Sequence, residues 1–118
     1  MTATAAGERP ATQQFAALAD DTRGAILELL GSEPRSASEL ARELPVSRQA
    51  IAKHLAVLEA AGLVEAVRDG RSVRHRAIGA SLSALADRLD AIGRAWDARL
   101  DRIATMAESR HDAAPLVE

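Results

Sequence analysis

Two long polar side chains, Arg48 and Gln49, stand at the start of a segment, residues 47–62, whose pattern predicts a helix. A guanidinium and a carboxamide can make paired hydrogen bonds to guanine and adenine edges in the major groove of DNA. Ala52 and Lys53 follow on the same face, and the small alanine would let the helix approach a groove closely. These residue types could therefore read base pairs, although the pattern alone also fits an ordinary amphipathic helix.

Both ends of this helix are marked in the sequence. The hydroxyl of Ser47 can accept a hydrogen bond from a first-turn amide, and Gly62 can adopt the left-handed conformation that ends a helix. The apolar positions recur at spacings of four and three, which predicts one buried stripe made of Ile51, Leu55 and Leu58.

Two short helices are expected near the start of the chain. Thr12 can cap the first, and Asp20 or Asp21 can cap the second, which should stop at Gly31. Residues 1–10 are small, polar and without pattern, so we expect a disordered N-terminal tail.

A third helix should lead directly into residues 47–62. Ser36 and Glu39 have the spacing of a capping box, and the helix should end at Leu44, before Pro45. Two short helices joined by a tight turn give a helix-turn-helix, in which residues 47–62 form the second helix.

A β-hairpin is expected next. Residues 63–68 and 71–78 read as strands on either side of Asp69-Gly70, a dipeptide that favours tight turns. A hairpin directly after a helix-turn-helix is a wing, and its arginines would lie where a phosphate backbone passes. The full set of side chains expected to contact double-stranded DNA is Ser36, Ser47, Arg48, Gln49, Ala52, Lys53, Arg68, Arg71 and Arg74. Within this set we expect Arg48 and Gln49 to read bases and Arg71 to hold a phosphate.

Ser81 should cap a long final helix that reaches about residue 107, followed by a flexible tail at residues 108–118. Its apolar residues follow a seven-residue repeat that is interrupted at Arg99. Because the helix is longer than a small domain can cover, part of this stripe should contact a second copy of the chain. The expected dimer interface consists of Leu82, Leu85, Leu89, Ile92 and Trp96, and the alternative is that the helix folds back on its own core.

Composition limits the possibilities. The chain has 118 residues, a net charge of −2 and no cysteine, which excludes disulfides, thiolate metal sites and cysteine nucleophiles. No apolar run approaches the roughly 20 residues of a membrane span, so we expect a cytoplasmic protein. Residues 35–78 carry eight basic and five acidic side chains, a local charge of +3 that favours a nucleic-acid partner.

Nothing in the sequence indicates catalysis. There is no Ser/His/Asp grouping in a motif, no phosphate-binding glycine loop and no recognisable carboxylate pair, so we expect no enzyme activity and no cofactor. His54, at the edge of the apolar stripe, is interpreted as a packing residue or a polar contact. His75, in the hairpin, should lie near a phosphate or the partner strand.

Several stretches together resemble the ArsR family of winged-helix transcriptional regulators. The opening LADDTRGAILELL at 18–30 is similar to the start of the family's domain, and SRQAIAKHL at 47–55 to its recognition helix. The exit LEAAGLV at 58–64 and the wing tip RDGR at 68–71 also match. The segment WDARL at 96–100 resembles a branch of the family that does not depend on metals.

The resemblance implies a winged helix-turn-helix at residues 11–80, mainly α-helical with one hairpin, and a dimerisation helix at 81–107. It also implies a homodimer that represses transcription from a palindromic operator until a signal releases it. Where founding members carry two metal-binding cysteines, this chain has Ser36 and Ser38, and serine hydroxyls are poor ligands for soft metals. No metal site is therefore expected, and the inducer is unknown. The competing hypothesis is a winged-helix protein-interaction module without DNA binding.

Overall fold

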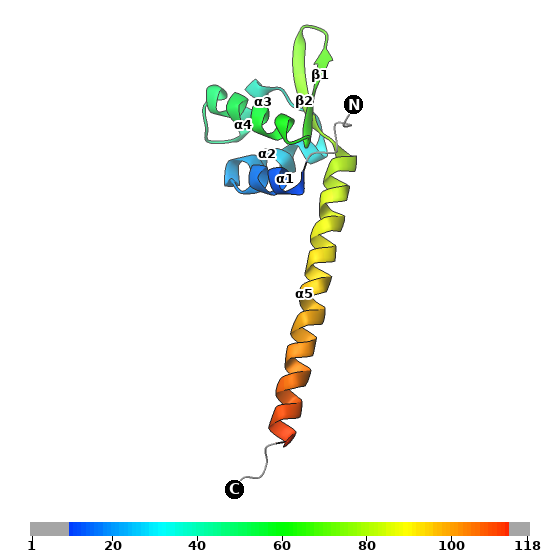
Figure 1. Ribbon diagram of the computed structural model, residues 1–118. Helices are drawn as coiled ribbons and strands as arrows, with labels where there is room; N and C mark the ends of the chain where they lie inside the picture. Colours follow the sequence, from blue (N-terminus) through cyan, green and yellow to red (C-terminus); the bar gives the residue numbers. More distant parts are fainter. Residues whose placement is uncertain (1–9, 114–118) are drawn as a thin grey trace. The chain divides into compact units, whose positions relative to one another are not determined.

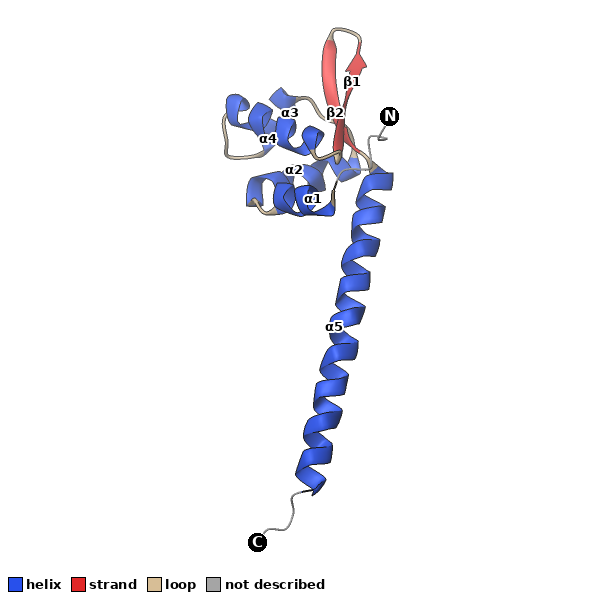
Figure 2. Ribbon diagram, in the orientation of Figure 1, coloured by secondary structure: helices blue, strands red, loops and turns tan. Residues whose placement is uncertain are grey.

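The computed structural model describes residues 10–113, which form two compact units that divide after Leu85. The first unit contains, in chain order, α1 (Ala11–Leu18), α2 (Asp21–Ser32), α3 (Ala37–Glu43), α4 (Arg48–Ala60), β1 (Val64–Asp69), β2 (Ser72–Ala77) and the first residues of α5 (Gly79–Ala113) (Figures 1 and 2). The rest of α5 makes the second unit. The expected fold class, mainly α with a small β-hairpin and a long C-terminal helix, is confirmed. None of the described helices is long and apolar enough to cross a membrane.

One apolar core holds the first unit together. The three predicted stripe residues of α4, Ile51, Leu55 and Leu58, are at most 3% exposed. Around them pack the buried residues of the other elements, which are Ala17, Ile26, Leu27, Leu30, Leu40, Ala61, Leu63, Val64 and Leu85. None of the buried core residues is aromatic, although the partly buried Phe15 packs against them, so the helices approach mainly through Leu, Ile and Ala around α4.

Three of the predicted helix caps, at Asp20, Ser36 and Ser47, are formed as the sequence indicated. The expected cap at Thr12 is wrong, because α1 already begins at Ala11, with Pro10 at the N-cap position and no side-chain cap. Asp20 accepts a hydrogen bond from the backbone N–H of Arg23 at 3.0 Å. The N–H of Glu39 donates to the Ser36 hydroxyl, and the Glu39 carboxylate accepts the N–H of Ser36 in return, which completes a capping box. Ser47 caps α4 by accepting from the N–H of Ala50 at 3.1 Å. These contacts fix where α2, α3 and α4 begin.

The C-terminal end of α4 is held by α1. Gln13 and Gln14 donate side-chain hydrogen bonds to the carbonyl oxygens of Ala60 and Ala61, at 3.1 and 3.2 Å. The last carbonyls of a helix have no partner within the helix, so these amides satisfy groups that would otherwise need water. Gly62 then leaves the helix with φ of 76°, as its position in the sequence predicted.

The wing is an antiparallel pair in which Asp69 lies opposite Ser72, so the turn consists of Gly70 and Arg71. This is one residue later than expected, because Asp69 still pairs within the ladder. Gly70 has φ of 64° and no non-glycine residue in the described chain has positive φ, which identifies a type II′ turn. On its other edge β2 pairs with Arg35, whose backbone exchanges two hydrogen bonds with that of His75, at 2.8 and 3.0 Å.

The start and end of α5 differ from the prediction. Ser81 does not cap the helix, which already begins at Gly79; its side chain is 2% exposed and its hydroxyl has no partner among the described residues. The helix also continues to Ala113, past the predicted end at residue 107. The remaining predicted tail segments, 1–9 and 114–118, lie outside the described residues.

Two of the five residues expected at the dimer interface already pack within the first unit. Leu85 is 4% exposed within the core of the first unit, and Leu82 packs against that core. Both were expected to contact a partner chain, but the seven-residue repeat begins inside the winged-helix unit, whose own core absorbs its first turns. Beyond Leu85, every described side chain up to residue 110 is exposed.

Candidate nucleic-acid interface

The exposed face of α4 carries the predicted base-reading side chains. Arg48, Gln49, Ala52 and Lys53 are all solvent-exposed on the side opposite the buried stripe. Ser47, also exposed, uses its hydroxyl oxygen as the helix cap. No hydrogen bond or ion pair with another described side chain or backbone group occupies the side chains of Arg48, Gln49 and Lys53, so their donors are available to a partner.

The wing arginines fall into two classes. Arg68 and Arg71 are exposed and form no ion pair with the part of the chain that the structure describes. Arg74 is 40% exposed and lies between two carboxylates, 3.6 Å from Glu39 and 3.5 Å from Asp69. The first two are therefore free to meet phosphate, whereas Arg74 joins the wing to α3. Its predicted role as a direct DNA contact is not supported by this geometry.

Two further arginines brace the same region. Arg76 pairs with Glu65 across the hairpin at 2.7 Å. Arg35, whose side chain is only 12% exposed, pairs with Glu43 at 2.6 Å and donates to the carbonyl oxygen of Leu29. Together with the backbone pairing between Arg35 and His75, these contacts tie α2, α3 and β2 together. The wing is thereby fixed relative to the helix-turn-helix.

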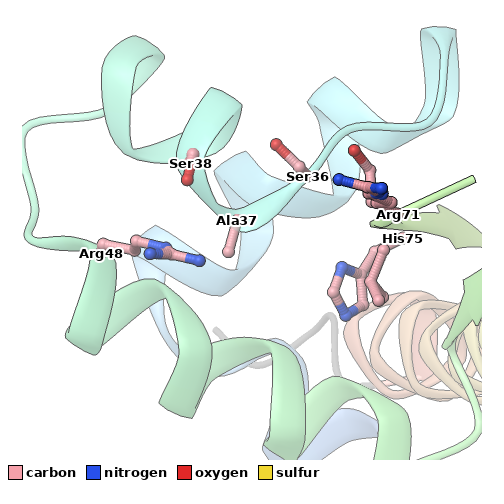
Figure 3. Close-up of a pocket in the computed structure, with 8 residues that line it drawn as sticks. Ser36, Ala37, Ser38, Arg48, Arg71 and His75 are labelled. Carbon is pink, nitrogen blue, oxygen red and sulfur yellow. The ribbon is translucent and has the colours of Figure 1, made fainter.

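A cleft of about 560 Å³ opens between α3, the start of α4 and the wing. Its lining residues are Ser36, Ala37, Ser38, Arg48, Arg71, Ser72, Val73 and His75. In Figure 3, Arg48 lies at one end of the cleft and Arg71 and His75 at the other, with Ser36 and Ala37 between them. The structure thus brings together three predicted DNA contacts, Ser36, Arg48 and Arg71, that are far apart in the sequence.

The carboxylate of Glu39 is held ionised beside this cleft. The backbone N–H of Ser36, which donates to it, lowers the pKa of Glu39 below its usual value, with smaller contributions from Arg74 and Arg42. Partial burial opposes this effect. The pKa of Asp20 is lowered in the same way by the N–H of Arg23. Both carboxylates therefore serve the fold as charged caps.

Among the side chains that the structure describes, no three His, Asp or Glu residues group together, so these offer no candidate for a metal centre. Ser36 and Ser38, which align with metal-binding cysteines in the resemblance, line the polar cleft instead. Ser36 is engaged in the capping box. The hydroxyl chemistry at this position suits hydrogen bonding.

The histidines of the first unit have structural surroundings. Nδ1 of His54 lies 3.4 Å from Nη1 of Arg23. Nε of the same arginine donates to the carbonyl oxygen of Ala17 at 2.6 Å. This agrees with the interpretation of His54 as a polar contact. His75 lines the cleft, and its Nδ1 is buried without a partner among the described residues.

The sequence did not identify the residues that hold α3 and the wing together through ion pairs and backbone pairing. Glu39 was predicted only as a cap, yet it is also the α3 partner of Arg74. Arg35 was not singled out, although it pairs with β2 through its backbone and with α3 through its side chain. No local signal identifies such pairs. The concentration of positive charge in residues 35–78 was the only hint that some arginines would need internal partners.

Comparison with known proteins identifies relatives over most of the chain. Residues 18–67 match the family model described as a helix-turn-helix domain. The HTH-type transcriptional regulator Rv2034 of Mycobacterium tuberculosis is 39% identical over 104 residues, which is 88% of this chain and 94% of that protein.

Solved structures agree with the sequence relatives. An ArsR-like transcriptional regulator from Rhodococcus sp. RHA1 is 55% identical, with a TM-score of 0.72 over 82% of this chain and 92% of that one. HlyU from Vibrio cholerae N16961 is 28% identical, with a TM-score of 0.58 over 70% of this chain and 89% of that one. Together with the helix-turn-helix, the wing and the exposed basic face of α4, these similarities show that the chain belongs to the ArsR family of winged helix-turn-helix transcriptional regulators.

Proposed function

We propose that the protein is a dimeric repressor that binds a palindromic operator through α4 and the wing of each protomer. The observation that carries this proposal is the exposed, unpaired set of donors at the start of α4, beside a wing whose tip presents free arginines. A recognition helix reads bases mainly with its N-terminal residues, which are here Arg48, Gln49, Ala52 and Lys53. The alanine keeps the helix surface low between the long side chains.

Dimerisation is inferred from the second unit. Beyond Leu85, α5 exposes large apolar side chains that are 44–59% accessible: Leu89, Ile92, Trp96, Leu100, Ile103 and Met106. A continuous stripe of this kind on a soluble protein marks an interaction surface. Its heptad-like spacing matches helix-to-helix packing, and a second copy of the same helix offers an equal stripe.

Two identical recognition helices related by a twofold axis would meet two identical half-sites, so a symmetric dimer favours a palindromic operator. Repression follows if that operator overlaps a promoter. The basic middle segment would supply the electrostatic, sequence-independent part of the affinity, which should fall steeply as salt rises.

A mobility-shift experiment with DNA from the protein's own promoter and with unrelated DNA, in moderate salt, tests the proposal. Specific retardation of the promoter fragment, with two protomers per complex, is expected. A reporter gene behind the same promoter should be expressed more strongly when the protein is absent. If neither fragment is retarded, the winged-helix unit would have to act as a protein-interaction module, and the proposed function would be wrong.

A further inference from the structure

Arg48 and Arg71 lie on different elements but share one cleft. Arg48 is the first residue of α4 and Arg71 is in the turn of the wing, yet both line the same cavity (Figure 3). Neither forms an ion pair within the described residues, and none of the eight lining side chains is acidic. The nearest carboxylate, that of Glu39, is already engaged by the N–H of Ser36 and by Arg74, so two guanidinium groups lining one space without an acidic neighbour in the lining create a positive site. The physical complement of such a site is an anion.

The remaining lining groups suit the oxygen atoms of a phosphodiester. Ser36, Ser38 and Ser72 bring hydroxyls to the cleft. The oxygen of Ser36 already accepts a hydrogen bond from the N–H of Glu39, so its proton remains available for donation. Phosphate oxygens only accept hydrogen bonds, and guanidinium and hydroxyl donors are typical of proteins that hold the DNA backbone.

The size and polarity of the cleft favour a segment of DNA backbone over an apolar small molecule as its ligand. Its volume of about 560 Å³ lies within the range of small-molecule pockets, roughly 300–1,000 Å³. Such pockets are lined mainly by apolar side chains, whereas arginine, serine and histidine dominate here. The space also exceeds what one small inorganic ion fills, so a stretch of sugar–phosphate backbone is the better match.

We propose that Arg48 and Arg71 together hold one stretch of DNA backbone in this cleft, so that Arg48 acts as a phosphate clamp and not as a base reader. This inference rests on the proposed function and refines it. Base reading then belongs to Gln49 and Lys53, which do not line the cleft. In this arrangement Arg48 contacts the DNA backbone and the next residue, Gln49, contacts a base.

The first test compares Arg48→Ala and Arg71→Ala in salt titrations on the promoter fragment and on a random duplex. Each variant should weaken binding to both duplexes by similar factors, about three- to fivefold, and reduce the salt slope by about one. A loss by Arg48→Ala of tenfold or more on the promoter alone would make Arg48 a base reader and overturn the inference, while the proposed function would stand. Failure of the wild-type protein to bind either duplex would instead contradict the proposed function.

The second test locates the clamp on the DNA. Neutral methylphosphonate linkages are introduced one at a time along the promoter fragment. At one linkage in each half-site, both Arg48→Ala and Arg71→Ala should cause no further loss, because the charge that they contact is already gone. Arg68→Ala is the matched control: it removes an equally free wing arginine that does not line the cleft, and its effect should remain additive at that linkage. Separate linkages for Arg48 and Arg71, or none, would contradict a shared site.

A third arm distinguishes the DNA backbone from free phosphate, since both offer the same oxygens. Replacing chloride by inorganic phosphate at constant ionic strength should leave the affinity of wild-type protein for DNA unchanged within twofold. Displacement from DNA by low millimolar phosphate that disappears in Arg48→Ala would show that the cleft is a small-anion site, and the backbone assignment would be wrong.

Discussion

The two units of this chain, residues 10–85 and 86–113, differ in where their apolar side chains lie. The first buries its apolar residues against one another, with Ile51, Leu58 and Leu63 fully enclosed. The second is one exposed helix whose apolar stripe has nothing to cover it within the described chain. An isolated helix gains little stability in water, since most helical stability comes from packing its apolar face. The first unit therefore contains its own apolar core, whereas the second leaves its apolar stripe exposed in the part of the chain that the structure describes.

The largest expected effect comes from a charge in the stripe of the second unit. Leu89→Glu should convert the dimer into monomers and abolish promoter binding, because each dimer would bury two unpaired carboxylates. The dimer dissociation constant should rise by at least about 1,000-fold, which sedimentation analysis can measure.

Ala91→Glu is the matched control, since it adds the same charge two residues away on the outer side of the helix, at an exposed position. It should leave the dimer intact. A dimeric Leu89→Glu variant with normal promoter binding would place the interface elsewhere.

The boundary between the units can be sharpened with two equal truncations. Leu85→Ala should destabilise the winged-helix unit by about 2–5 kcal/mol, because Leu85 lies in its core. Leu89→Ala, four residues further, should leave the stability of that unit unchanged. It should only reduce the rise of the unfolding temperature with protein concentration that dimerisation causes. Thermal unfolding at several protein concentrations separates the two effects. If both variants depended equally on concentration, Leu85 would belong to the dimer interface after all.

Within the first unit, Arg74 is held by an ion pair whereas Arg68 and Arg71 are not. Breaking that ion pair should change promoter affinity by a smaller factor, and should lower it even though a negative charge is removed. Glu39→Gln keeps the capping box, since glutamine can fill the same role, but removes the ion pair with Arg74. If that pair positions the wing, promoter affinity should fall by about two- to fivefold, since a partly exposed pair contributes at most about 1 kcal/mol.

The opposite result is informative for Glu39→Gln. Removing a negative charge beside DNA would ordinarily strengthen binding. Higher affinity in the variant would therefore mean that Arg74, once released, contacts phosphate directly, as its sequence position first suggested. Fluorescence anisotropy with labelled promoter DNA is sensitive enough to decide between the two.

The smallest expected effect is a change of the unfolding temperature at acidic pH. Because the pKa of Glu39 is lowered below its usual 4.5 in the folded protein, its ionised form stabilises the fold above that pH. This contribution should disappear as the pH falls from 4.5 through the folded pKa. The unfolding temperature of the wild type should exceed that of Glu39→Gln slightly at pH 7, and this difference should shrink as the pH is lowered below 4.5. A constant difference across this range would exclude the carboxylate charge as the cause.

Much of the fold could be predicted because its determinants are local. The capping box of Ser36 and Glu39 spans four residues, and Gly62 and Gly70 occupy the left-handed conformations that their neighbours require. The prediction that Ser81 caps α5 was wrong because a serine before an apolar run looks the same whether it caps a helix or lies inside its first turn.

The candidate site was only partly predictable, because its arrangement depends on contacts between distant residues. The sequence indicates that Arg68, Arg71 and Arg74 lie on a wing, but not that Arg74 alone meets Glu39, 35 residues earlier. Nor does it indicate that Arg48 and Arg71 line one cleft. Such differences follow from how α3, α4 and the hairpin pack, which no short motif records.

The most direct test of the central claim, that the exposed start of α4 reads DNA sequence, is the affinity of Gln49→Ala for the promoter fragment and for a random duplex of equal length at one salt concentration. Loss of a paired hydrogen bond to a base should weaken promoter binding by roughly tenfold or more, since such contacts discriminate by about 1–3 kcal/mol. Binding to the random duplex should change by less than about twofold, because Gln49 carries no charge to pair with phosphate. Equal losses on both duplexes, or no loss on either, would contradict base reading by α4.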